Sequence, residues 1–131
     1  MRLHPLLRVT VFTLSILVTG CGGTWLQVKS APDTNDGAFV MLVARKVDTE
    51  TFATETYGQI EQLVGTPDES LLLEPQRIEP DQVKWVRVKV PRDADWAVYV
   101  LYTEPGRPWK KMMPENRKVH RIELSRWRIN E

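Results

Sequence analysis

Cysteine and histidine are scarce in this chain, and their scarcity excludes several kinds of site. The sequence has one cysteine, Cys21, and two histidines, His4 and His120. A single cysteine cannot form a disulfide within the chain, and a zinc site needs three or four His, Cys or carboxylate ligands, a set that this chain does not convincingly supply. A Ser–His–Asp or Cys–His site would have to be built around His120, which stands in an alternating strand pattern typical of a structural residue. We expect no enzyme activity, no catalytic residue, no metal and no dissociable cofactor.

Charge of one sign is not in excess either. The chain has 18 basic and 17 acidic residues. This balance gives no reason to expect nucleic acid as a partner.

Long apolar runs are also missing, but the N-terminus has a short one. Residues 9–18 are mostly apolar and follow Arg2 and Arg8, whereas a bilayer-spanning helix needs about 20 apolar residues. The run leads into small residues and then Cys21, an order typical of a bacterial lipoprotein signal. It predicts cleavage before Cys21 and a covalent lipid on its sulfur; the alternative is an ordinary secretory signal followed by a free thiol. The residues expected to be recognised for cleavage are Val18, Thr19 and Gly20.

Cleavage at this point would divide the chain into three parts. Residues 1–20 are the leader, residues 21–24 the acylated cysteine and a short tether, and residues 25–131 a single domain. Gly22 follows the cysteine in place of the aspartate that often retains lipoproteins in the inner membrane. The sequence therefore favours lipid anchoring in the outer membrane, with the domain facing the periplasm.

Strand patterns dominate the expected domain, which is predicted to be mainly β, a sandwich with one or two short inserted helices. Trp85 beside Val86 interrupts the alternation and predicts a bulge. The helical pattern covers residues 52–64, with a cap at Asp48, Thr49 or Thr51 and a weak point at Gly58. The expected strands cover residues 25–29, 38–44, 71–73, 83–90, 96–102, 109–113 and 119–124.

A run of turn-forming residues separates the first two expected strands. They are Asp33, Thr34, Asn35, Asp36 and Gly37. The run does not fit an EF-hand, because Gly37 and Ala44 stand where that motif needs ligands. Two interpretations of this run remain: a plain hairpin turn, or a loop that binds a partner.

The tryptophans are interpreted mostly as core residues, with two alternatives. Trp25, close to the expected anchor, would suit a membrane interface. Trp85, Trp96 or Trp109 would suit a platform for a small ligand, peptide or glycan, which would make the protein a binding module.

The order of these features resembles the TssJ family, also called SciN or VasD, the outer-membrane lipoproteins of type VI secretion. The resemblance rests on the lipoprotein signal, the strand at residues 25–29, the Ala-Pro-Asp-Thr-Asn segment at residues 31–35, the apolar strand after it and the helix at residues 52–63. Asp36 stands where the family often has proline, and residues 44–47 lack the usual tyrosine-glutamine-leucine stretch. These departures leave open a divergent relative or a binding module outside secretion.

The resemblance implies a transthyretin-like β-sandwich without catalysis. It also implies that the protein binds the periplasmic C-terminal region of a TssM-like inner-membrane protein, in a complex where several copies could form a ring. The partner-binding loop would comprise Asp33, Thr34, Asn35, Asp36 and Gly37.

Overall fold

The described part of the chain is a sandwich of two four-stranded sheets. The structure is a computed structural model that describes residues 23–106, 108–114 and 117–130. Cys21 and the cleavage residues Val18, Thr19 and Gly20 lie outside the described residues, so the lipoprotein signal and the domain boundaries stay predictions.

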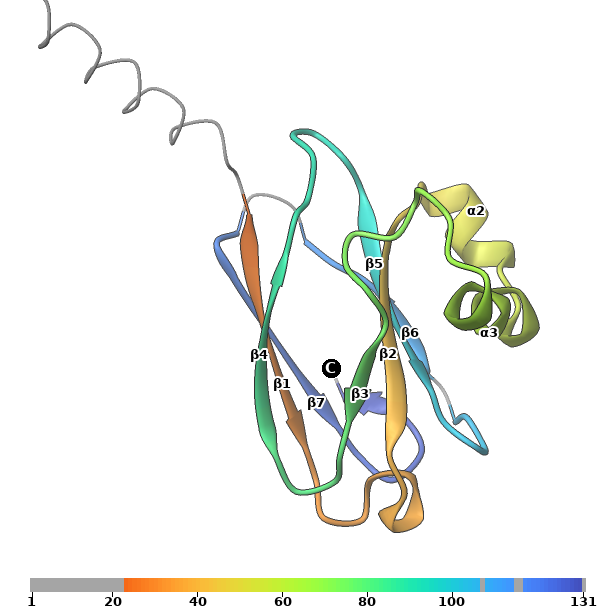
Figure 1. Cartoon of the computed structure of the whole chain (residues 1–131), viewed down its shortest axis with the longest axis vertical. Helices are drawn as coiled ribbons and strands as arrows, with labels where there is room; N and C mark the ends of the chain where they lie inside the picture. The colour runs from red at the N-terminus through yellow and green to blue at the C-terminus, as the bar shows by residue number, and fades with distance from the viewer. Residues whose placement is uncertain (1–22, 107, 115–116, 131) are drawn as a thin grey trace, which may run out of the picture.

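The first sheet has the strand order β4-β1-β7-β8 and the second has the order β3-β2-β5-β6. β1 lies inside the first sheet, antiparallel to β4 and parallel to β7. The strands of the first sheet are β1 (Thr24–Ser30), β4 (Val83–Val88), β7 (Val119–Leu124) and β8 (Ile129–Asn130). Those of the second are β2 (Val40–Lys46), β3 (Gln76–Ile78), β5 (Trp96–Leu101) and β6 (Lys110–Met112). The predicted mainly β sandwich is confirmed (Figure 1).

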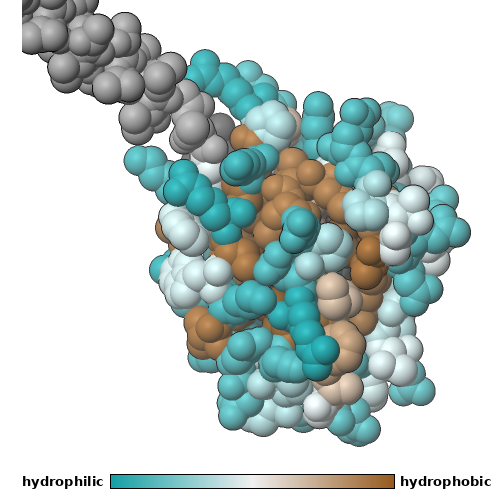
Figure 2. Space-filling view, viewed as in Figure 1, coloured by the Kyte–Doolittle hydropathy of each residue, from teal (hydrophilic) through white to brown (hydrophobic). Residues whose placement is uncertain are grey.

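The core lies between the two sheets, and the strand alternation explains it. Leu26 and Val28 point inward from β1, and Leu42 and Val98 meet them from the second sheet; all four are fully buried. Figure 2 shows apolar side chains filling the space between the sheets along the edge where β4 and β3 lie. β5 is buried on both faces, because helices cover its other side.

Two short helices, α2 (Thr49–Thr54) and α3 (Tyr57–Gly65), follow β2 and cover the outer face of the second sheet (Figure 1). The Asp48 side chain accepts a hydrogen bond from the Thr51 amide and caps α2, as predicted. The break between the helices falls at Glu55 rather than at Gly58, because Thr56 begins α3 with a capping box. Neither helix is long and apolar enough to span a membrane, nor is any other helix in the described part.

Three details of the predicted strands are wrong. Residues 71–73 make only an isolated bridge between Leu71 and Arg45; the leucines are half-buried against the two apolar clusters, so their hydrophobicity reflects packing and not a strand. β3 forms instead over Gln76–Ile78, and the two-residue β8 was not predicted. Trp85 marks no bulge: it pairs in regular register with Gln27 and points outward, 47% exposed.

Candidate functional site

The connection between β1 and β2 is the site that the sequence singled out, and it folds as a tight turn, η1 (Thr34–Gly37). Asn35, Asp36 and Gly37 have positive φ angles of 49°, 56° and 91°. Asn, Asp and Gly tolerate this left-handed region better than other residues. The turn-forming residues of the sequence therefore do adopt the left-handed backbone that they tolerate.

Two of the five predicted partner-binding residues point into the protein. Asn35 is 4% exposed: its Nδ2 donates to the Phe39 carbonyl at 2.9 Å and its Oδ1 accepts from the Thr103 amide at 2.9 Å. Thr34 is fully buried, and its Oγ1 donates to the Leu124 carbonyl at 3.3 Å. Both side chains tie the turn to neighbouring segments and cannot present themselves to a partner.

Asp33, Asp36 and Gly37 are exposed on the outer side of the same turn. Asp36 forms an ion pair with Arg126 from the connection between β7 and β8, with Oδ1 and Nη2 2.9 Å apart. Both side chains are more than half exposed, so the pair leaves its charges accessible to a binding protein.

Sequence reasoning missed two neighbours of the turn. Phe39 is 42% exposed although it stands in the apolar run of the predicted second strand, and the Arg77 guanidinium lies 3.8 Å from its ring centroid. The structure starts β2 only at Val40.

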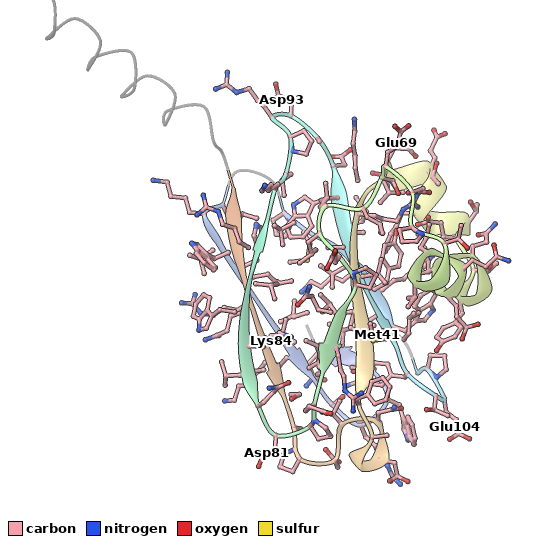
Figure 3. The ribbon with its side chains drawn as sticks, in the orientation of Figure 1. Met41, Glu69, Asp81, Lys84, Asp93 and Glu104 are labelled. Atoms are coloured by element: carbon pink, nitrogen blue, oxygen red, sulfur yellow. The ribbon has the colours of Figure 1, made fainter. Side chains whose placement is uncertain are left out.

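Phe39, Tyr57 and Glu61 also line a recess of about 600 Å³ between the turn and α3, and Met41 lies on the same side of the molecule (Figure 3). The exposed turn, Phe39 and this recess together form the candidate binding surface.

The candidate binding surface lies at the far end of the sandwich from the N-terminal end of β1. β1 runs from one end of the molecule to the other, and the β1–β2 connection follows at its far end (Figure 1). Seven extended residues span about 23 Å. The N-terminal end of β1 and the candidate binding surface are thus held apart by the length of the fold.

His120 lies near the N-terminal end of β1, away from this surface. It is 4% exposed, and its ring meets that of Trp96 edge-on at 5.2 Å between centroids. Burial, and secondly the positive charge of Arg117, lower the pKa of His120 below its usual value. Within the described ranges no group of three or more His, Cys, Asp or Glu residues lies close enough together to hold a metal ion.

The tryptophans do not form the platform that a ligand-binding module would need. Trp96 is 2% exposed in the core. Trp109 is half-buried, with ring centroids 5.3 Å from Tyr57 and 5.9 Å from Tyr99. Of the three tryptophans proposed for a platform, only Trp85 is exposed.

A buried polar cluster lies beneath the helices. Glu55 forms an ion pair with Arg45 and accepts a hydrogen bond from the Tyr99 hydroxyl, and its side chain is 7% exposed. Lys110 donates to the carbonyls of Phe52 and Glu55 at the end of α2, and burial lowers its pKa. These groups satisfy one another, so the cluster fixes the helices to the sheet.

The fold of the described chain, a β-sandwich with two short helices, is shared with solved type VI secretion lipoproteins. Similar structures include the Serratia marcescens Lip, described as a membrane-bound component of the Type VI Secretion System: the TM-score is 0.64, the identity is 14%, and 82% of this chain and 95% of that chain are covered. The lipoprotein TssJ1 from Pseudomonas aeruginosa is similar with a TM-score of 0.60 and 13% identity, over 82% of this chain and 92% of that chain. The expected TssJ resemblance is confirmed at the level of the fold.

A third solved structure is also similar in fold. A chain in a structure described as the T6SS protein TssM C-terminal domain from EAEC has a TM-score of 0.58 and 18% identity, over 82% of this chain and 98% of that chain.

The family model described as "IglE, N-terminal domain" matches residues 40–124. The chain belongs to this family. No curated protein matches the chain.

Proposed function

We propose that the protein is an outer-membrane lipoprotein of a type VI secretion membrane complex. Acyl chains on Cys21 hold it in the membrane, its domain faces the periplasm, and it binds the periplasmic C-terminal region of a TssM-like inner-membrane protein. It performs no catalytic step; its role is to link the inner-membrane protein to the outer membrane.

The observation that carries this proposal is the fold shared with type VI secretion lipoproteins over 82% of the chain. The lipoprotein signal in the sequence supports the anchor. The separation of the candidate binding surface from the N-terminal end of β1 supports the link, because a partner reaching from the opposite membrane meets the far end of the domain first.

The partner is tested by calorimetry with the full lipoprotein in detergent and the periplasmic C-terminal region of the TssM-like protein of the same host. We expect a Kd of about 1 µM or tighter. A variant with Asp33→Arg and Asp36→Asn changes the exposed side of the turn while asparagine keeps the left-handed backbone at position 36. It is expected to weaken binding about tenfold or more.

The matched control is Asp93→Asn, because Asp93 is also exposed and has a positive φ, of 59°, but lies at the opposite end of the sandwich (Figure 3). Weakening by the turn variant alone supports the proposed surface. Equal binding by all variants would move the interface elsewhere, and no binding at high concentration would reject the secretion role.

Asn35 is deliberately left unchanged in this test. Its amide is buried and hydrogen-bonded, so a loss of binding on its removal would report a displaced turn and not a lost contact.

A further inference from the structure

The end of the sandwich at which β1 begins carries an exposed tryptophan beside an arginine. Trp25 is 42% exposed on the outer face of the first sheet, and its Cα partner in β4 is Arg87, whose guanidinium lies 5.6 Å from the indole centroid. The Arg87 side chain also lies close over Gly23, within 2.8 Å of where a Cβ would stand. An aromatic ring with a neighbouring cation suits the headgroup region of a membrane.

A small basic pocket opens at the same end. It has a volume of about 160 Å³, and Arg92 and Arg117 are among the residues that line it, together with Thr24 and Asp93. The Thr24 hydroxyl donates to the Arg117 carbonyl at 2.7 Å, so β1 holds the segment that carries Arg117 in place. Arg92 and Arg117 both line this opening, and arginine suits a phosphate because its guanidinium can donate hydrogen bonds in a fork.

The cations at this end are available to an outside anion. They are the exposed residues Arg87, Lys89, Arg92, Arg117 and Lys118. None of the five forms an ion pair with a carboxylate in the described part of the chain.

Acidic groups of the described residues also lie at this end, and one of them, Asp93, lines the same pocket as Arg92 and Arg117. Asp48, Asp93 and Asp95 line a separate recess next to the start of the helices, and Glu69 lies on the helix side of the molecule (Figure 3).

The length of chain before β1 determines what can reach this end. Residues 22–23 separate Cys21 from Thr24, and the three extended steps between these two residues span at most about 11 Å. If Cys21 carries the acyl chains, the groups around the start of β1 stand at the level of the lipid phosphates.

We propose that this end of the domain is a membrane-binding surface, comprising Trp25, Arg87, Arg92, Arg117 and Lys118, which rests on anionic lipid headgroups. The indole of Trp25 enters the headgroup region and the cations bind lipid phosphates. This inference rests on the lipid anchor of the proposed function and adds a second, non-covalent contact that orients the domain.

The test uses the lipoprotein purified from membranes and placed in vesicles of two parts phosphatidylcholine to one part phosphatidylglycerol. The lipids carry bromine near the headgroup end of their chains, where it quenches tryptophan fluorescence on contact. The protein is expected to be quenched, Trp25→Phe to lose most of the quenched emission, and Trp85→Phe to keep it. Trp85 is the matched control because it lies on the same face, 47% exposed, two residues farther along β4 from the membrane end.

The charge contribution is tested by Arg117→Gln against Arg126→Gln. Arg126 is exposed at the other end of the sandwich, beside the β1–β2 turn. Arg117→Gln is expected to reduce the ratio of docked to undocked domain about fivefold on the anionic vesicles. The same change is expected to have little effect on pure phosphatidylcholine, and Arg126→Gln little effect on either.

The outcomes separate this proposal from the one before it. The mass of the purified protein reports whether Cys21 carries lipid; a protein without lipid overturns the anchor and this surface together. If the protein is lipidated but the emission of Trp25 is not quenched, only the membrane-binding surface is overturned. The same holds if Trp25→Phe and Trp85→Phe lose equal amounts of quenched emission. Binding to the TssM-like region, measured as above, is unaffected by that outcome.

Discussion

Asn35 shows how a residue predicted for recognition can serve the fold instead. Its backbone is left-handed, and both ends of its side-chain amide bond to the main chain of other segments. The sequence could indicate a turn at this position but not the direction of the side chain, because that depends on Thr103, 68 residues farther along.

Asn35→Ala is expected to lower the free energy of unfolding by about 2–4 kcal/mol, because it removes two buried hydrogen bonds and places alanine at a positive φ. Asp36→Asn should cost less than about 1 kcal/mol, since its ion pair is exposed and asparagine accepts the same backbone. Denaturant unfolding followed by tryptophan fluorescence measures both. Similar losses for the two variants would contradict the structural role of Asn35.

His120 makes stability depend on pH. Its pKa in the folded protein is lowered by burial and by Arg117 from the usual value near 6.5, so the folded state binds fewer protons than the unfolded state below that pH. The stability is therefore complete above about pH 7 and declines as the pH falls through 6.5 toward the lowered pKa, by at most about 1.4 kcal/mol per pH unit.

The measurement is the free energy of unfolding between about pH 5 and 7, for the protein and for His120→Gln. The variant should be less stable at neutral pH and show a flatter profile in this window. An equally steep profile in the variant would assign the pH dependence to another group.

At the scale of the elements, the helices depend on the buried ion pair of Arg45 and Glu55. Glu55→Leu is expected to lower the free energy of unfolding by about 3–5 kcal/mol, because it leaves the Arg45 guanidinium buried without its partner. The double variant Arg45→Met with Glu55→Leu should be less destabilised than the single one, since it removes both charges. The free energies of unfolding of both single variants and the double variant are measured by thermal or denaturant unfolding, followed by circular dichroism. A double variant whose loss of stability equals the summed losses of Glu55→Leu and Arg45→Met would refute this prediction.

Strands with clear alternation were predictable because burial on one face determines them. β1, β4 and β7 follow this pattern, and β5 is a continuous apolar run buried on both faces. β3 was missed because its three residues, Gln76, Arg77 and Ile78, carry no pattern of their own and form a strand only beside β2. The predicted bulge at Trp85 is wrong because this large aromatic residue lies on the exposed face of a regular strand.

At the scale of the whole molecule, the proposed membrane-binding surface depends on the short segment between Cys21 and β1. Inserting six Gly/Ser residues between Gly22 and Gly23 adds a flexible chain with an end-to-end distance of about 13 Å. This change is expected to reduce quenching of Trp25 by brominated lipids. The longer linker allows the domain many positions away from the membrane, so the effective concentration of the surface at the headgroups falls. Binding to the TssM-like region in detergent should be unchanged, and unaltered quenching would show that the headgroup contacts alone suffice to hold the domain.

The position of β1 has a mechanical consequence. This strand connects directly to the N-terminal segment at one end and to the β1–β2 turn at the other, and it pairs with six residues of β4 on one side and six of β7 on the other. Ladder hydrogen bonds lie roughly across the strands. A pull between the lipid and a protein held at the turn therefore loads β1 in shear, along its length, and the ladders on both sides must yield together. Under the proposed anchoring, the strand that follows the lipid would therefore be held by two ladders of six residue pairs each.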